Sequence, residues 1–394
     1  MTEDLSSRWS LDPAVSHLNH GSFGAAPTAV LDAQRALRDR MERNPMAFFV
    51  RDGERLLDEA RAAVSDFVGC DADDLCAVPN ATAAVNTVLR SLALSPGDEL
   101  LALDHGYNAC LNALRFVAEK AGARVVVVKV PFPGAGQGEV LEAVLRAVTS
   151  RTRLALLDHV TSPTALVLPV EILVRPLRER GVEVFIDGAH APGMLPLNVS
   201  ALGAGYYTGN LHKWVCAPKG AAFLHVRRDL QGGVRPLSIS HGANATRSDR
   251  SRFRLEFDWT GTHDPTAFLA APVAIREVGG MLPGGWEAVR RRNRATALRA
   301  REVLCDALGV EAPAPDSMIG TMAAVPLPAS LTLPFDPCEP EMDPLAWRLL
   351  REHAIEVPVY PSPSGEGKLL RVSAQLYNRD AEYERLARAL RSMM

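Results

Sequence analysis

A single lysine stands in a polar, glycine-containing stretch near the middle of the chain. Residues 206–214 read Tyr-Tyr-Thr-Gly-Asn-Leu-His-Lys-Trp, and the lysine is Lys213. Lysine is scarce in this protein, because only five of its 43 Lys and Arg residues are Lys. Upstream, the apolar run 184–186 ends at Asp187. That pattern is typical of a buried strand that delivers a carboxylate to its C-terminal end.

An amine and a carboxylate delivered by neighbouring strand ends suit pyridoxal phosphate. The lysine would hold the cofactor aldehyde as a Schiff base, and the aspartate would pair with the protonated pyridine nitrogen. A free Lys213 amine could also serve as the general base that moves an α-proton. Taken alone, a lysine after a small polar turn is more often a solvated surface residue, so a catalytic role for Lys213 needs support from other parts of the chain.

A phosphate site is predicted where a short strand over 74–79 meets a helix. Asn80, Ala81 and Thr82 open this helix, which runs through Ser91. The first backbone N–H groups of a helix are unpaired, and the helix dipole favours an anion there. Ordinary capping by Asn or Thr explains the same residues equally well.

Apolar strands alternate with helices over the first two thirds of the chain, which predicts an α/β fold. Strands are expected at 99–104, 124–130, 153–158, 184–187, 204–208 and 220–226, and helices at 28–43, 51–68, 80–91 and 170–180. This alternation favours a mostly parallel sheet with helices on both faces. After residue 265, helices at 266–278, 286–308 and 381–393 surround Pro-rich strands. We therefore expect an N-terminal arm (1–16), a large domain (17–264) and a smaller C-terminal α+β domain (265–394).

Composition excludes several classes of function. The chain has 394 residues, of which 47% are hydrophobic and 23% charged, as in ordinary globular proteins. A net charge of −3 gives no reason to expect nucleic acid or a membrane surface as partner. No apolar run approaches the length of a membrane span, and the polar start lacks a signal-peptide core. The six cysteines (70, 76, 110, 216, 305 and 338) show no metal-binding spacing, so we expect no metal, no disulfide framework and a cytoplasmic location.

Several motifs in order along the chain resemble one family. These are LNHGSFGAAP (18–27), NATAAVNTVLRS (80–91), DHGYNA (104–109), FIDGAHAPG (185–193), YYTGNLHKWVCAPKG (206–220), WTGTHDP (259–265) and LRVSAQLYN (370–378). Together they resemble the class V aminotransferase family of pyridoxal-phosphate enzymes, and within it the isopenicillin N epimerase-like branch. The resemblance implies a fold-type I enzyme, a homodimer and a small amino-acid substrate.

The resemblance also implies roles for individual residues. His190 would approach the phenolic oxygen of the cofactor, although a satisfied core histidine is the alternative. Tyr107, or else His105, would cover the cofactor ring. Arg371 would bind the substrate carboxylate beside Asn19 and Gly21, with a structural salt bridge as the alternative. The remaining contacts would come from Ser162 at the ring, from Ala81, Thr82, His212 and either Thr208 or Asn210 at the phosphate, and from Thr262 of a neighbouring subunit.

These roles predict an enzyme that acts at the α-carbon of an amino acid. Racemisation or epimerisation through an α-carbanion is the first expectation, with Tyr107 or a histidine opposite Lys213. A C–S lyase that eliminates a β-substituent from a cysteine conjugate is the close alternative, and a non-catalytic cofactor-binding protein is a third. The segment 358–367 has no cysteine where related cysteine desulfurases carry their nucleophile, so persulfide chemistry is not expected. Cys110 and Cys216 are expected to be small core residues.

Overall fold

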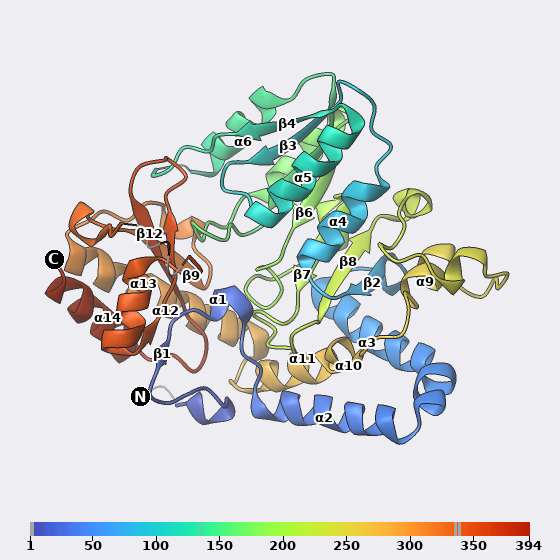
Figure 1. Cartoon of the computed structure of the whole chain (residues 1–394), viewed down its shortest axis with the longest axis horizontal. Helices are drawn as coiled ribbons and strands as arrows, with labels where there is room; N and C mark the ends of the chain where they lie inside the picture. The colour runs from blue at the N-terminus through green and yellow to red at the C-terminus, as the bar shows by residue number, and fades with distance from the viewer. Residues whose placement is uncertain (1–3, 135, 335–336, 338–339) are drawn as a thin grey trace.

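A seven-stranded sheet forms the centre of the protein in the computed structural model, which describes residues 4–134, 136–334, 337 and 340–394 (Figure 1). Across the sheet the order is β2-β8-β7-β6-β5-β3-β4. The strands are β2 (Leu75–Val78), β3 (Glu99–Leu103), β4 (Arg124–Val128), β5 (Thr152–Asp158), β6 (Glu183–Asp187), β7 (Tyr206–Asn210) and β8 (Ala222–Val226).

Four of the six pairings in this sheet are parallel, and only those that involve β8 are antiparallel. The predicted mostly parallel sheet is therefore confirmed. Parallel strands bring their carboxyl ends to one edge of a sheet, where α/β proteins place their ligands. Here Asp187 at the end of β6 lies in register with Asp158 on β5 and with Thr208 on β7.

Helices cover both faces of the sheet because its strands are apolar on both sides. On β3, Leu101 and Leu103 belong to one buried cluster, while Leu100 and Ala102 belong to another. The first cluster packs under α2 (Thr28–Arg43), α3 (Gly53–Val68), α6 (Gln137–Ala147), α7 (Val170–Glu179), α10 (Thr266–Leu269) and α11 (Ala271–Gly280). The second cluster packs under α4 (Ala81–Ser91), α5 (Asn108–Ala121) and α9 (Arg252–Phe257).

Most predicted elements have the expected bounds, but one strand is displaced. The strand predicted at 204–208 runs over Tyr206–Asn210, so Thr208 lies inside the strand and Asn210 at its end. The loop between α2 and α3 contains a π-helical turn, Ala47–Asp52, and the glycine turn near the N-terminus contains a short helix, α1 (His20–Phe23). Short helical segments complete the large unit, among them α8 (Val199–Leu202).

A second core forms around a three-stranded antiparallel sheet in the order β11-β12-β9 (Figure 1). Leu18 also packs in this core, because β1 pairs in parallel with β10. By contrast α10 and α11, which follow the predicted boundary at 265, pack in the core of the large sheet. The elements of this second unit are β1 (Ser16–His17), β9 (Met322–Pro326), β10 (Ile355–Glu356), β11 (Val359–Pro361), β12 (Lys368–Ser373), α12 (Gly285–Leu308), α13 (Pro344–His353) and α14 (Asp380–Ser392).

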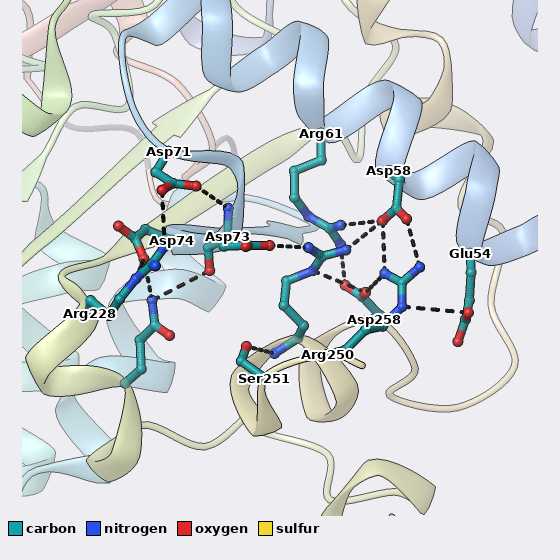
Figure 2. A network of polar contacts seen from close by, with 12 residues as sticks. Glu54, Asp58, Arg61, Asp71, Asp73, Asp74, Arg228, Arg250, Ser251 and Asp258 are labelled. Atoms are coloured by element: carbon teal, nitrogen blue, oxygen red, sulfur yellow. Dashed lines mark hydrogen bonds and ion pairs between the residues drawn. The ribbon is translucent and has the colours of Figure 1, made fainter. Parts of the chain in front are cut away.

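A network of arginines and carboxylates fixes the segment around α9 to α3 (Figure 2). Arg61, on α3, has a side chain only 1% exposed and contacts Asp58 at 2.8 Å as well as Asp258. Arg250 donates to both oxygens of Asp58, at 2.9 and 2.6 Å, and Arg254 reaches Asp73 at 2.6 Å. Because Arg61 is buried, its charge requires these carboxylate partners.

Three structural findings concern membrane spans, cysteine pairing and metal binding. No helix in the described part of the chain is long and apolar enough to cross a membrane. Five cysteines (70, 76, 110, 216 and 305) are free thiols, and Cys338 lies outside the described residues. Over residues 4–134, 136–334, 337 and 340–394, no cluster of His, Cys, Asp and Glu could hold a metal ion.

Candidate active site

A pocket of about 360 Å³ opens at the carboxyl edge of the large sheet. It brings together nine of the predicted site residues, namely Ala81, Thr82, Tyr107, Ser162, Asp187, His190, Asn210, His212 and Lys213. These residues come from different strand ends and helix starts, as expected for a site at this edge. Asp158, Lys219 and Ser22 also line the pocket and were not singled out from the sequence, and Asn80, which precedes the predicted phosphate-binding helix, lines it too.

Lys213 projects into this pocket beside His190. The Lys213 Nζ lies 2.9 Å from His190 Nε2, and the Trp214 indole N–H donates to His190 Nδ1 at 3.4 Å. A neutral His190 that accepts at Nδ1 carries its proton on Nε2 and donates it to the amine. This arrangement requires Lys213 to be the free amine.

Electrostatics favour that free amine. Part of the Lys213 side chain is open to the pocket, but surrounding atoms bury its amine enough to lower its pKa to about 7. The Arg371 guanidinium lowers the pKa of Lys213 further, and Asp187 opposes both effects. Burial, then Lys213, also lower the pKa of His190 well below its usual value. Near pH 7 the pair is therefore an uncharged imidazole and an amine that is about half unprotonated.

Asp187 is buried with a donor on each oxygen. Its Oδ1 accepts the Ala189 N–H at 3.0 Å, and its Oδ2 accepts from the Cys110 thiol at 3.2 Å. Burial raises the pKa of Asp187, while both hydrogen bonds and Lys213 oppose the rise. Burial and the Asp187 charge raise the pKa of Asp158 more strongly. Adjacent buried carboxyls do not both ionise readily, and the stronger rise at Asp158 favours a proton there and the charge on Asp187.

The start of α4 forms the opposite end of the pocket. The Ala83 N–H donates to the Asn80 side chain at 2.8 Å, and the Ala81 N–H donates to Asn210 Oδ1 at 2.9 Å. Within the described chain, the Thr82 hydroxyl has no hydrogen-bond partner, so it is available to an anion. His212 is held by the Ala221 carbonyl at 3.1 Å, and burial lowers its pKa to about 4. The Ala81 and Ala83 N–H groups are already paired, so Thr82 is the donor that this helix start offers to a phosphate.

Two predicted phosphate contacts lie elsewhere. The Thr208 hydroxyl is fully buried and donates to the Phe223 carbonyl of β8 at 2.7 Å, so it does not line the pocket. This follows from the displaced strand, which puts Asn210 at the strand end in place of Thr208. Thr262 is exposed and lines no part of this pocket, and its contact to a neighbouring subunit stays a prediction.

Arg371 is fully buried on β12, just behind the pocket wall. It donates to the Ser162 carbonyl at 2.7 Å and hydroxyl at 3.1 Å, and to Ser22 Oγ at 3.1 Å. Its guanidinium carbon lies 5.1 Å from the centre of the Tyr360 ring. No carboxylate within the described residues pairs with it, and its Nε has no partner. A buried cation surrounded only by neutral acceptors is suited to an added carboxylate. Ser162, predicted to contact the cofactor ring, lines the pocket and also accepts from this arginine, so its contact to the ring stays a prediction.

The N-terminal glycine turn contacts Arg371 and the strand that carries it. Asn19 Oδ1 accepts from Arg371 at 3.2 Å, and the Gly21 N–H donates to Ser373 Oγ at 3.0 Å. A Cβ at Gly21 would overlap the Met322 sulfur, so a larger residue there would require the Met322 side chain to move. Asn19 and Gly21 therefore support Arg371 from behind and do not line the pocket itself.

Of the two residues predicted to cover a cofactor ring, the structure places only Tyr107 in the pocket. Tyr107 caps α5 and is 46% exposed, while burial raises the pKa of its phenol. His105 is 1% exposed and bonds to Thr164 at 2.9 Å, away from the pocket.

The family model for class-V aminotransferases matches residues 24–329 of this sequence. The chain belongs to that family. An isopenicillin N epimerase from Amycolatopsis lactamdurans is 38% identical to this class-V protein over 98% of this chain and 96% of its own. A probable chloroplastic L-cysteine desulfhydrase from Arabidopsis thaliana is 31% identical over 97% of this chain and 84% of its own. The predicted resemblance is thus confirmed.

Solved structures support the fold of this class-V protein. The cystine C–S lyase C-DES, in complex with its product cysteine persulfide, superposes with a TM-score of 0.80 at 21% identity, over 96% of this chain and 98% of that one. A cysteine desulfurase from Thermococcus onnurineus also gives 0.80 at 18% identity, over 100% of this chain and 98% of that one. The predicted fold-type I architecture is therefore confirmed.

Membership of the class-V family confirms that the chain is an enzyme and that its cofactor is pyridoxal phosphate. The pocket fits this cofactor on its own chemistry. A buried carboxyl, a half-protonated amine and the free Thr82 hydroxyl at a helix start match the ring nitrogen, the aldehyde and the phosphate. Lys213, Asp187 and Thr82 would hold these three groups.

Proposed function

We propose that this enzyme removes a proton from the α-carbon of an amino acid and returns one on the opposite face, as an epimerase or racemase does. Two pocket groups in complementary protonation states carry the proposal. About half of Lys213 is free amine near pH 7, whereas the Tyr107 phenol keeps its proton because burial raises its pKa. A base and an acid that line one pocket are what a proton exchange between two faces needs.

Each residue of the site has a separate role in this proposal. Pyridoxal phosphate supplies, when bound, an electron sink that makes the α-proton acidic. Arg371 holds the substrate carboxylate and so fixes the α-carbon near Lys213. His190 keeps the amine of Lys213 neutral by donating to it, and Tyr107 delivers the returning proton. The 38% identity with the isopenicillin N epimerase supports this proposal over nearly the whole chain.

Elimination at the β-carbon is the second candidate, because the probable L-cysteine desulfhydrase of Arabidopsis thaliana is also similar over 97% of this chain. The same base and the same carboxylate site serve both reactions, so a leaving group on the β-carbon of the substrate decides which reaction occurs. An assay in D₂O separates them. An epimerase gives inverted product with deuterium at the α-carbon, whereas a lyase gives pyruvate, ammonia and a thiol or sulfide from a cysteine conjugate.

The substrate panel for this assay should include large apolar side chains. A cavity of about 610 Å³ shares Pro79 and Gly220 with the catalytic pocket, and Phe48, Phe49 and Trp259 line it. Release of pyruvate and sulfide from cysteine without any α-inversion across the panel would replace the epimerase proposal with the lyase.

We also propose that the enzyme is a cytoplasmic homodimer in which Thr262 completes the phosphate site of the partner. The family resemblance supports the dimer, and the exposure of Thr262 is consistent with such a contact. Light scattering of the purified protein tests the dimer. Mixing inactive Lys213→Ala and Thr262→Ala chains tests the shared site, because hybrids would regain one intact pocket. Cell fractionation tests the location.

A further inference from the structure

Cys110 lies in the first turn of α5, three residues after Tyr107 and behind the pocket wall. Its side chain is 3% exposed, and its sulfur lies 3.2 Å from Asp187 Oδ2. One helix start therefore supplies a phenol to the pocket and a thiol to the carboxylate beneath it. The proposed function assigns no role to this thiol.

The thiol acts as the donor in this contact. Burial and the neighbouring Asp187 and Asp158 carboxyls raise the pKa of Cys110 far above its usual range, so it keeps its proton. Asp187 accepts that proton on Oδ2 and the Ala189 N–H on Oδ1. Each carboxylate oxygen retains a lone pair for a further donor.

The contact also stabilises the charged form of one of two adjacent carboxyls. Asp158 and Asp187 are both buried and lie in register on neighbouring strands. The Cys110 and Ala189 donors contact Asp187, and a hydrogen bond to a charged acceptor stabilises the ionised form. Without the thiol, the preference for an ionised Asp187 would weaken.

We propose that Cys110 is a positioning residue that holds Asp187 as an oriented carboxylate for the ring nitrogen of pyridoxal phosphate. The proposal rests on the cofactor part of the proposed function and not on epimerisation. It predicts that Cys110 matters only when the cofactor has a ring nitrogen to be paired.

Cys76 provides a matched control. Both cysteines are buried in the same apolar cluster beneath α4 and α5, but the Cys76 thiol faces the Leu224 backbone carbonyl at 3.5 Å. Truncation to alanine removes the same atoms at both positions, and only the Cys110 change removes a donor to Asp187.

The experiment measures the affinity of apoprotein for pyridoxal phosphate and for an analogue whose ring nitrogen is replaced by C–H. Cys110→Ala should weaken binding of pyridoxal phosphate about tenfold. This is the lower end of the effect expected for a hydrogen bond to a charged group, because a thiol is a weak donor. It should leave affinity for the analogue within about twofold of the wild type, which is well below that expected bond effect. Cys110→Ser, which restores a donor, should bind both compounds as the wild type does, and Cys76→Ala should change both affinities equally.

Three results would overturn the proposal. Equal weakening of both compounds by Cys110→Ala would make the thiol a packing residue. Unchanged affinity for pyridoxal phosphate would remove the role altogether. A wild type that does not distinguish the two compounds would show that Asp187 does not pair with the ring nitrogen. None of these depends on turnover, so failure to find inversion with any amino acid would refute the epimerase alone.

Discussion

The reactivity of Lys213 in the apoprotein should follow an amine pKa near 7, and Arg371 should help to set that value. Burial is the larger cause of the lowered pKa and the Arg371 charge the second. The perturbation is the pair Arg371→Met, which removes the charge, and Arg371→Lys, which keeps it. Arg371→Met should raise the pH at which half of Lys213 is unprotonated. This midpoint should stay nearer 7 than 10.5, because burial, the larger cause, remains.

The size of the effect follows from the fraction of free amine. At pH 7 an amine with a pKa of about 7 is about half unprotonated, whereas a lysine at its ordinary value is unprotonated in about one molecule in 3,000. Lys213 should therefore react with aldehydes at pH 7 on the order of 10³-fold faster than an exposed lysine, before any effect of positioning.

The assay is reductive methylation of the apoprotein by formaldehyde from pH 5.5 to 10, with peptide mapping of each lysine. Labelling of Lys213 should rise through a midpoint near 7, while the exposed Lys120 serves as the internal reference. The reasoning is refuted if the Lys213 midpoint lies near 10, or if Arg371→Met and Arg371→Lys give the same midpoint.

Four further outcomes are expected. Borohydride reduction of the holoprotein should leave the pyridoxyl group on Lys213, and peptide mapping that finds it on another lysine would contradict the site. Asp187→Ala should retain some cofactor by absorbance yet lose turnover by about 10²–10³-fold or more, because a preorganised electrostatic contact is lost. Tyr107→Phe should still exchange the α-proton with D₂O but lose most inversion in chiral analysis, and equal loss of both would argue against its role. Arg61→Met should lower the free energy of unfolding in urea by about 2 kcal/mol, because the largely buried Asp258 loses one of its three arginine partners. The exposed Arg35→Met control should cost less than about 1 kcal/mol.

The sequence predicts the strands of the large sheet well because their residues are apolar on both faces. It also predicts the meeting of Lys213 with Asp187, since the strand ends that carry them share one edge. Asp158 could have been found by the same rule, because it too ends an apolar strand. The contact between Cys110 and Asp187 could not, since it depends on the rotation of α5 against β6.

Other details depend on packing that no local pattern reports. The side on which Thr208 points is set by its antiparallel neighbour β8, whose Phe223 carbonyl accepts its hydroxyl. The lack of a carboxylate beside Arg371 among the described residues is likewise a property of the folded chain. Motif order identified Arg371 among many arginines, but only the structure shows that its charge is unmatched.

The pairing of the N-terminal turn with the last strand has a consequence for the order in which the protein is made. His20, which holds the Lys213 carbonyl at 3.0 Å, is bonded at its other nitrogen to Tyr377, 357 residues away along the chain. The large sheet is complete once β8 has left the ribosome, because its last strand ends at Val226. Arg371 and Tyr377 emerge only at the end of synthesis, and long-range contacts of this kind form late. Lys213 and Asp187 are thus on the growing chain well before Arg371, the proposed carboxylate site, is made.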